Sequence, residues 1–397
     1  MSDFEKIRLK NGMTVLLEHR KLPIVSVMAA VKYGSACDPE KLKGIAHFLE
    51  HSVFKGTRKR SQKEIAETIE KHGGELNAAT AEEFTFFYSK LPSKFAVLGI
   101  DIISDLMINP LLKKEFVEFE KQVILEEINL YHDRPELYVT DKISNILYES
   151  PFGMSPLGTK ENIQNISRND LLKIHKYYNP KQMILSIVGK IDREDALLNI
   201  EKQFKSKNSV CPPHFLARQR KKFSSMVETR EGLEQSHVCF GFPICSLSQK
   251  ERYAAELFNS ILGVGMSSWL WQEIREKRGL AYTISSHLNQ GKNFGYCYIY
   301  GGIRRGHATD SINLIKEQIS KFNKLSKSDL EDAKEQLIGN FELSNEKSDK
   351  TALSLIQEEI VKGAEEHYLY PERISAIKLE DVRAIARIKN HAFVVLT

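Results

Sequence analysis

The amino-acid sequence predicts an α+β protein with two homologous domains, each a mostly antiparallel sheet with flanking helices, joined by a linker. Each half of the 397-residue chain opens with the alternation of apolar and polar residues that is typical of half-buried strands. Long charged helical segments then come in runs, and not one per strand, which favours α+β over a parallel α/β fold. Residues 119–124 (FEKQVI) resemble residues 333–338 (AKEQLI), with Gln122 and Gln336 214 positions apart, which indicates an internal duplication.

The expected elements follow a similar order in both halves. The first half shows strand patterns at 14–17 and 25–28, a helix around 44–51, a long charged helix at 115–133 and a closing apolar strand at 183–188. The second half shows a strand at 238–242, long charged helices and a closing strand at 392–396. This shared order supports the duplication.

The least regular stretch is 204–225, which we interpret as a linker between domains at 1–203 and 226–397. Its Pro212-Pro213 pair cannot continue a helix or a central strand. Six basic residues surround the prolines, so an anion-binding arm is the alternative to a solvated connector. These residues are Lys205, Lys207, Arg218, Arg220, Lys221 and Lys222.

Composition argues against two classes of partner. The 57 basic and 52 acidic side chains leave a net charge of only +5, too small to predict nucleic-acid binding. No stretch approaches the roughly 18 apolar residues of a membrane span. Residues 1–6 (MSDFEK) carry acids where a signal or transit peptide has none, so we expect a cytoplasmic protein.

The cysteines lead to the same expectation. Five of them are scattered without a CxxC pair, which argues against a disulfide framework and a thiolate zinc site. We expect buried, reduced thiols, as in the cytoplasm; a reducing organelle interior would also suit them. They are Cys37, Cys211, Cys239, Cys245 and Cys297.

The strongest chemical signal is the segment 44–51 (GIAHFLEH). On a helix, His47 and His51 lie one turn apart on the same face, with Glu50 beside them. Two imidazoles at this spacing can share a zinc ion, and Glu50 can take a proton from the water that the metal activates. This is the H-x-x-E-H arrangement. The alternative is a helix with two exposed histidines.

A third ligand is expected from the helix 115–133. Glu120 and Glu127 lie seven residues apart and therefore on the same face, with Val123 and Ile124 predicted to pack that face against the sheet. Buried carboxylates there would need a metal or a histidine N–H as partner. Exposed surface acids are the alternative. The acidic candidates are Glu118, Glu120, Glu126 and Glu127.

These motifs together resemble the pitrilysin/insulinase family of zinc peptidases, which includes the mitochondrial processing peptidases. The resemblance implies one Zn²⁺ per chain, bound by His47, His51 and Glu127, the last with 75 residues between it and His51. It also implies that Glu120 orients a zinc-binding histidine. The matching segments are 34–35 (GS), 47–51 (HFLEH), 54–57 (FKGT), 76–80 (LNAAT) and 120–127 (EKQVILEE).

The second half resembles the family's C-terminal domain at 262–268 (LGVGMSS) and 275–282 (REKRGLAY). The resemblance implies that Arg275 and Tyr282 bind the substrate backbone and stabilise the tetrahedral intermediate, as a cation and a phenol can. From the residues alone, a surface arginine and a core tyrosine would be the simpler interpretation. Phe341 stands 214 positions after Glu127, so this half is expected to bind no metal.

The resemblance implies a zinc-dependent endopeptidase that cuts extended peptides, with Glu50 as general base and then as proton donor to the leaving amine. Asn77 and Ala78 match the family's edge strand, to which a peptide can add through main-chain hydrogen bonds. Because the chain carries both the zinc motif and the Arg275/Tyr282 pair, a homodimer forming a clamshell chamber is expected.

Two alternatives remain. One is a presequence-processing peptidase. The other is a non-catalytic peptide-binding subunit of a heterodimer, against which the intact set of His47, Glu50, His51 and Glu127 argues.

Overall fold

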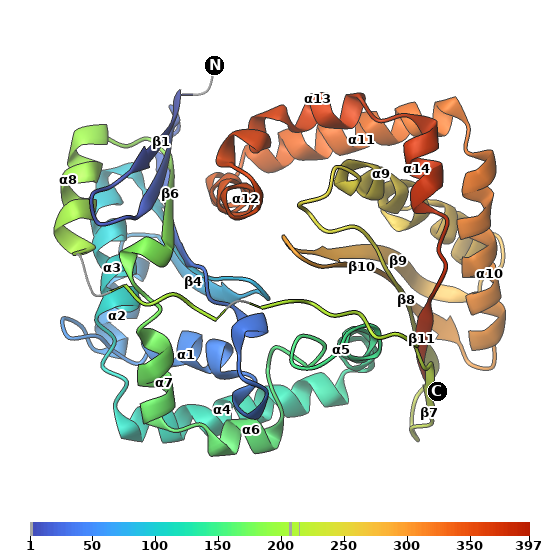
Figure 1. Cartoon of the computed structure of the whole chain (residues 1–397), viewed down its shortest axis with the longest axis horizontal. Coiled ribbons are helices and arrows are strands. Elements are labelled where there is room, and N and C mark those ends of the chain that lie inside the picture. Colours follow the sequence, from blue (N-terminus) through green and yellow to red (C-terminus); the bar gives the residue numbers. More distant parts are fainter. Residues whose placement is uncertain (1–2, 206–208, 214) are drawn as a thin grey trace. The chain divides into compact units, whose positions relative to one another are not determined.

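A computed structural model describes residues 3–205, 209–213 and 215–397, so residues 206–208 and 214 of the predicted linker lie outside the described part. The chain forms two compact units (Figure 1). The first unit comprises residues up to 128, 156–215 and 343–367. The second comprises 129–155, 216–342 and 368–397.

The first unit contains a six-stranded sheet in the order β1-β2-β6-β3-β5-β4. Neighbouring strands are antiparallel except for β2 and β6, which are parallel. The strand order leaves β4 at one edge of the sheet. The strands are β1 (Asp3–Arg8), β2 (Thr14–His19), β3 (Ile24–Val31), β4 (Glu75–Thr80), β5 (Thr85–Pro92) and β6 (Met183–Gly189).

Helices cover both faces of this sheet. On β3, the side chain of Val27 belongs to the core into which α3 packs. The preceding residue, Ser26, forms a hydrogen bond with Ser348 of α12. Because successive strand residues point to opposite faces, α3 and α12 lie on opposite sides. The helices are α1 (Ile45–Val53), α2 (Gln62–Glu70), α3 (Ala96–Ile108), α4 (Lys114–Asp133), α6 (Lys160–Asn165), α7 (Arg168–His175), α8 (Arg193–Gln203) and α12 (Ser348–Val361), α4 ending in the second unit.

The second unit repeats the arrangement with five strands in the order β7-β11-β8-β10-β9. Its one parallel pair, β7 and β11, stands where β2 and β6 stand in the first sheet. The strands are β7 (Met226–Glu228), β8 (Gln235–Pro243), β9 (Ala281–Gln290), β10 (Gly295–Arg304) and β11 (Ala392–Leu396). The helices are α5 (Pro135–Leu147), α9 (Arg252–Gly263), α10 (Ala308–Ser320), α11 (Lys327–Asn345, ending in the first unit), α13 (Tyr370–Ser375) and α14 (Leu379–Ile385). The predicted α+β class with two mostly antiparallel sheets is confirmed.

Each unit takes one helix from the other half of the sequence. Helix α5 packs on β8 and β11 of the second unit, and α12 packs on β3 and β6 of the first, where the red helix lies beside blue strands (Figure 1). The fit of α5 is close, because a Cβ on Gly241 of β8 would come within 2.4 Å of Ile143. The segment 204–225 therefore separates the two sheets in sequence without separating these helices.

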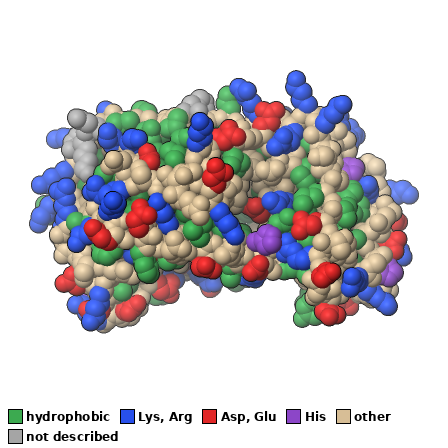
Figure 2. Space-filling view, turned by 90° about the horizontal axis from the view of Figure 1, so that it is seen from below, with side chains coloured by type: hydrophobic (Ala, Val, Ile, Leu, Met, Phe, Trp, Pro, Cys, Tyr) green, Lys and Arg blue, Asp and Glu red, His purple; other side chains and the backbone are tan. Residues whose placement is uncertain are grey.

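The surface charges and the cysteines agree only in part with what the composition predicts. Lys and Arg side chains are interspersed with Asp and Glu on the face shown in Figure 2. All five cysteines are free, and Cys239 and Cys297 are buried as expected, but Cys211 is exposed and so departs from that expectation. Within the described residues, no helix is both long and apolar enough to cross a membrane.

Candidate metal centre

The helix that carries the H-x-x-E-H motif is fixed at its N-terminus by a buried carboxylate. The backbone N–H groups of Gly44 and Ala46 donate to Asp38 at 2.9 and 3.2 Å, and the Tyr33 hydroxyl donates to it at 3.1 Å. Burial raises the pKa of Asp38 to about 7, although the nearby Lys43 ammonium and these hydrogen bonds act in the opposite direction. Gly44 adopts a φ of 95°, in the left-handed region that suits glycine. Sequence reasoning missed this anchor.

Three predicted ligands converge. His47 and His51 of α1 lie with their ring centres 4.5 Å apart, and both Nε2 atoms are 3.7 Å from Oε2 of Glu127 on α4. One ligand atom from each of the three residues lies within 4.8 Å of the others. Of the four acidic candidates on α4, Glu127 is the one that joins this group among the described residues.

The spacing fits a zinc ion. At 3.7 Å the imidazole nitrogens are too far from the carboxylate for hydrogen bonds, yet they converge on it. Tetrahedral zinc with bonds of about 2.0–2.1 Å separates its ligand atoms by roughly 3.4 Å. Two imidazoles and one carboxylate are also the donor set of many catalytic zinc sites, which leave the fourth position open.

The titration behaviour of the ligands suits metal binding. Burial, with a smaller effect of the His51 charge, lowers the pKa of His47 to about 3, so its imidazole is neutral at physiological pH. Its buried Nδ1 has no hydrogen-bond partner within the described residues. Burial raises the pKa of Glu127, and the charge of His51 offsets part of that increase. A cation at the centre would offset the free-energy cost of burying the ionised Glu127 carboxylate.

His51 is oriented by a carboxylate. Its Nδ1–H donates to Oε2 of Glu120 at 3.2 Å, which turns Nε2 toward Glu127. Glu120 is 2% exposed, and Lys55 places its Nζ 2.6 Å from the other carboxylate oxygen. Burial alone would raise the pKa of Glu120, but the hydrogen bonds from His51 and Lys55 outweigh it and lower this pKa.

The pKa of His51 is also set by opposing effects. Burial lowers it, but the hydrogen bond to Glu120 and the charges of nearby Glu127 and Glu50 raise it more. Sequence reasoning found Glu120 but not Lys55, which follows α1. The prediction that Val123 packs on the sheet was wrong, because this side chain is 39% exposed, while Ile124 is fully buried.

Glu50 lies on the same helix and points toward the edge strand. The Thr80 hydroxyl of β4 donates to Oε2 of Glu50 at 2.5 Å. Burial raises the pKa of Glu50, and the Thr80 hydrogen bond lowers it by less. A carboxylate with a raised pKa accepts a proton more readily, which suits a general base. Thr80 has no role in the sequence-based prediction.

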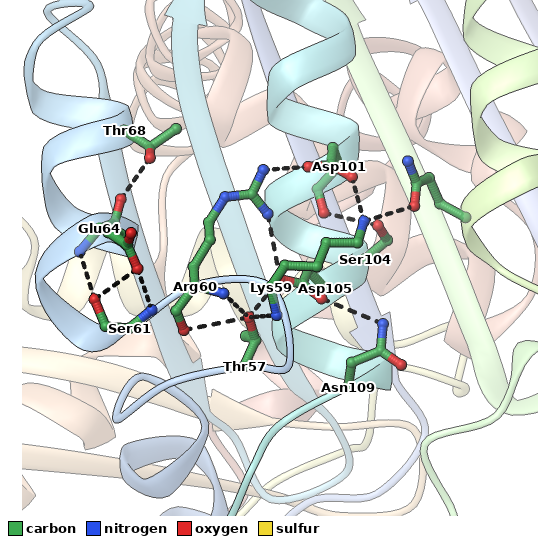
Figure 3. Close-up of polar contacts among 11 residues, drawn as sticks. Thr57, Lys59, Arg60, Ser61, Glu64, Thr68, Asp101, Ser104, Asp105 and Asn109 are labelled. Carbon is green, nitrogen blue, oxygen red and sulfur yellow. Dashed lines mark hydrogen bonds and ion pairs between the residues drawn. The ribbon is translucent and has the colours of Figure 1, made fainter.

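The loop between α1 and α2 is held by ionic contacts to α3 (Figure 3). Arg60 pairs with Asp101 and Asp105, Lys59 donates to Asp101 at 2.7 Å, and the Thr57 hydroxyl donates to Asp105 at 2.5 Å. These contacts pair two of the loop's four basic side chains, Lys59 and Arg60, with carboxylates of α3. They also fix the end of the segment from which Lys55 reaches Glu120.

The predicted substrate-binding residues Asn77 and Ala78 lie on β4, the edge of the first sheet. They pair with Tyr88 and Phe87 of β5, which leaves the other side of β4 without a strand neighbour among the described residues. Thr80, at the end of the same strand, donates its hydroxyl hydrogen bond to Glu50. The edge therefore runs up to the metal centre.

Arg275 and Tyr282 lie in the second unit, and the metal centre lies in the first. The Arg275 guanidinium stacks 3.9 Å from the ring centre of Trp271 and lies 5.9 Å from that of Tyr282. Tyr282 is 75% exposed, so it is not a core tyrosine. The position that corresponds to Glu127 holds Phe341, whose ring stacks on Tyr370 at 4.7 Å.

Comparisons with known proteins agree with these motifs. Residues 14–160 match the family model "Insulinase (Peptidase family M16)", and residues 165–337 match "Peptidase M16 inactive domain". The chain is 30% identical to uncharacterized zinc protease YmxG of Bacillus subtilis, over 95% of this chain and 93% of that protein. It is 33% identical to an uncharacterized zinc protease of Rickettsia bellii, over 94% and 91%.

Solved structures share the fold. A protease from Helicobacter pylori has a TM-score of 0.93 at 24% identity, covering both chains completely. A peptidase M16 inactive domain from Pseudomonas fluorescens has a TM-score of 0.89 at 17% identity, covering 99% of this chain and 97% of that one. The model matches and the two relatives show that this chain belongs to the pitrilysin/insulinase family, peptidase family M16, in its half-length form.

Proposed function

We propose that this protein is a zinc-dependent endopeptidase that hydrolyses peptide bonds in extended or unfolded segments. The observation that carries the proposal is the convergence of His47, His51 and Glu127 within 4.8 Å, with Glu50 one residue before His51. A group of this composition holds zinc, and Glu50 is placed to move protons beside it.

The residues of the centre have different roles in this proposal. His47, His51 and Glu127 would hold the ion, and Glu120 keeps the His51 ring turned so that its Nε2 faces the ligand group. With zinc bound, this group would supply Lewis-acid chemistry, that is, polarisation of the scissile carbonyl and a lower pKa of the attacking water. Glu50 takes the proton from the attacking water at a carboxylate oxygen and later returns it to the leaving amine.

The edge strand explains how a peptide would be held. A substrate in extended conformation can add to β4 through main-chain hydrogen bonds, which do not depend on side-chain identity. Because Thr80 of β4 contacts Glu50, a peptide on this edge would pass the general base. This arrangement suits unfolded or extended peptides better than folded proteins.

Arg275 and Tyr282 complete the proposal. Their groups donate hydrogen bonds to the substrate backbone and to the oxyanion that develops on the attacked carbonyl. We place them on the zinc centre of a partner in a homodimeric clamshell, because one chain carries both motifs. Light scattering tests the dimer, and mixing Glu50→Gln chains with Arg275→Ala chains tests the sharing. Activity restored in the mixture supports shared sites.

The decisive test uses a ladder of unstructured peptides from roughly ten to seventy residues, incubated with zinc-loaded protein and read by mass spectrometry. We expect chelator-sensitive cuts with the wild type and none with Glu50→Gln. If zinc is bound and no peptide is cut, the protein is either a presequence-specific enzyme or a non-catalytic peptide-binding subunit. If no zinc is bound, the proposal is wrong.

A further inference from the structure

The proposed general base, Glu50, is held by a hydroxyl group from another element. Thr80, the last residue of β4, donates to Oε2 of the buried Glu50 carboxylate at 2.5 Å. Among the described residues, no other side chain forms a hydrogen bond with Glu50. One carboxylate oxygen is therefore fixed, and the other is left to accept the proton of the attacking water.

The direction of this hydrogen bond follows from the neighbouring groups. Thr85 of β5 stands directly opposite Thr80, and the two hydroxyl oxygens lie 3.5 Å apart. The single proton of the Thr85 hydroxyl goes to the carbonyl oxygen of Tyr33, at 2.9 Å. An ionised carboxylate can only accept, so Thr80 is the donor to Glu50. Such a bond to a charged group is stronger than one between neutral groups.

The turn that follows β4 is fixed by the backbone of an earlier segment. The N–H of Ser35 donates to the carbonyl oxygen of Ala81 at 3.0 Å. The N–H of Ala36 donates to the carbonyl oxygen of Glu82 at 2.8 Å. The two backbones approach closely, because a Cβ on Gly34 would come within 2.4 Å of the Ala81 oxygen. The last residue of β4 is therefore held in place from the side of the turn.

The same segment holds helix α1. The buried Asp38 carboxylate accepts hydrogen bonds from two backbone N–H groups at the start of this helix. The buried Lys43 ammonium donates to the carbonyl oxygen of Ser35 at 2.7 Å. The segment 34–44 therefore fixes both the end of β4 and the helix that carries the base. A side chain whose partner is held in this way is preorganised, as a reacting group must be.

We propose that Thr80 is a positioning residue, whose hydroxyl fixes the Glu50 carboxylate in the orientation that takes the proton from the attacking water. Its contribution to the rate passes through Glu50. The inference rests on the proposed function for the identity of the reaction. The placement of the carboxylate by Thr80 does not depend on it.

The first test removes the hydroxyl. Thr80→Val should keep the fold, since valine is favoured in strands. We expect kcat, measured at the pH optimum of each variant, to fall at least about tenfold, as for the loss of a hydrogen bond to a charged group. Zinc content and KM should stay unchanged, because the ligands and the backbone of β4 are untouched. Thr80→Ser keeps the hydroxyl and should retain most of the activity.

The matched control is Thr68→Val on α2, which removes a hydroxyl that donates to a backbone carbonyl and should keep full activity. A second background tests whether Thr80 acts through Glu50. In the Glu50→Gln protein, Thr80→Val should cause no further loss of the residual rate, because residues that act as one unit are not additive. A further loss of the same size would overturn the inference. An unchanged kcat in Thr80→Val, or equal losses in Thr80→Val and Thr80→Ser, would do the same.

Crystal structures of the zinc-loaded variants separate this inference from the proposed function, because they require no cleavage. We expect the Glu50 side chain to keep its rotamer in Thr80→Ser and to leave it in Thr80→Val. An unmoved Glu50 in Thr80→Val overturns the inference. Absence of peptide cleavage by the wild type would count against the proposed function alone, and the crystal structures would still decide whether Thr80 places the carboxylate.

Discussion

At the scale of single residues, the centre separates metal binding from proton transfer. His47, His51 and Glu127 supply the converging atoms, whereas Glu50 points to Thr80 and belongs to no ligand group among the described residues. The two functions therefore depend on different side chains, although Glu50 shares a helix turn of α1 with both histidines. Mutations can address them independently.

The change Glu50→Gln keeps the size of the side chain and its ability to accept the Thr80 hydrogen bond. The amide cannot take a proton, so we expect peptide turnover to fall at least 100-fold, within the range for loss of a general base. Zinc content by mass spectrometry should stay at one ion per chain. Glu118→Gln, on the exposed side of α4, serves as the control and should keep full activity. Equal activity of both variants would contradict the role of Glu50.

Lys55 is the residue-scale finding that the sequence did not provide. Its ammonium is the second partner of the buried Glu120 carboxylate, which orients His51. Lys55→Met should raise the pKa of Glu120 and loosen the imidazole, so we expect zinc affinity to fall about tenfold. Competition with a fluorescent chelator measures it. Lys114→Met, which removes an exposed cation of α4, should leave the affinity unchanged, and an equal loss in both variants would count against orientation through Glu120.

At the scale of elements, much of this site could be predicted because its spacing is local. His47, Glu50 and His51 share one helix turn, and the predicted helices and closing strands are present within a few residues of their predicted limits. Thr80 and Lys55 have no such periodic signature, because contacts between different elements leave no period in the sequence. An apolar helix face does not tell which sheet the helix covers, so the positions of α5 and α12 could not be predicted from the sequence.

The start of α1 gives an element-scale prediction. Alanine at Gly44 would hold an unfavourable positive φ, and its Cβ would come within 2.4 Å of the Leu157 carbonyl oxygen. We expect Gly44→Ala to cost about 3 kcal/mol or more of unfolding free energy in urea, since strain and backbone overlap combine. Gly73→Ala is the matched control: its φ is also positive, at 69°, but no heavy atom lies within 4 Å, so about 1 kcal/mol is expected. Similar losses would mean that the neighbouring backbone moves aside.

At the scale of the whole molecule, the duplication has kept topology and changed chemistry. The five strands of the second sheet follow the same order as β2-β6-β3-β5-β4 of the first, each sheet with one parallel pair among the described strands. Yet Phe341 stacks on Tyr370 where its counterpart Glu127 faces two histidines. In the second unit, by contrast, the Tyr282 side chain is exposed and the Arg275 guanidinium stacks on the ring of Trp271. One copy is thus suited to bind metal and the other to present hydrogen-bond donors.

The exchange of α5 and α12 between the units leads to the last prediction. It tests whether the sheets are stabilised by helices from the other half of the sequence. Leu355 of α12 and Ile143 of α5 are both fully buried, the first in the unit with the metal centre and the second in the other. Replacement of either by alanine should cost about 2–5 kcal/mol, because a cavity remains against the sheet. Hydrogen exchange read by mass spectrometry should show faster exchange in β3 and β6 for Leu355→Ala, and in β8 and β11 for Ile143→Ala. Each mutation would therefore loosen the sheet in the other half of the sequence. Faster exchange confined to the sheet of the same half would show that the two halves fold as sequence-continuous domains.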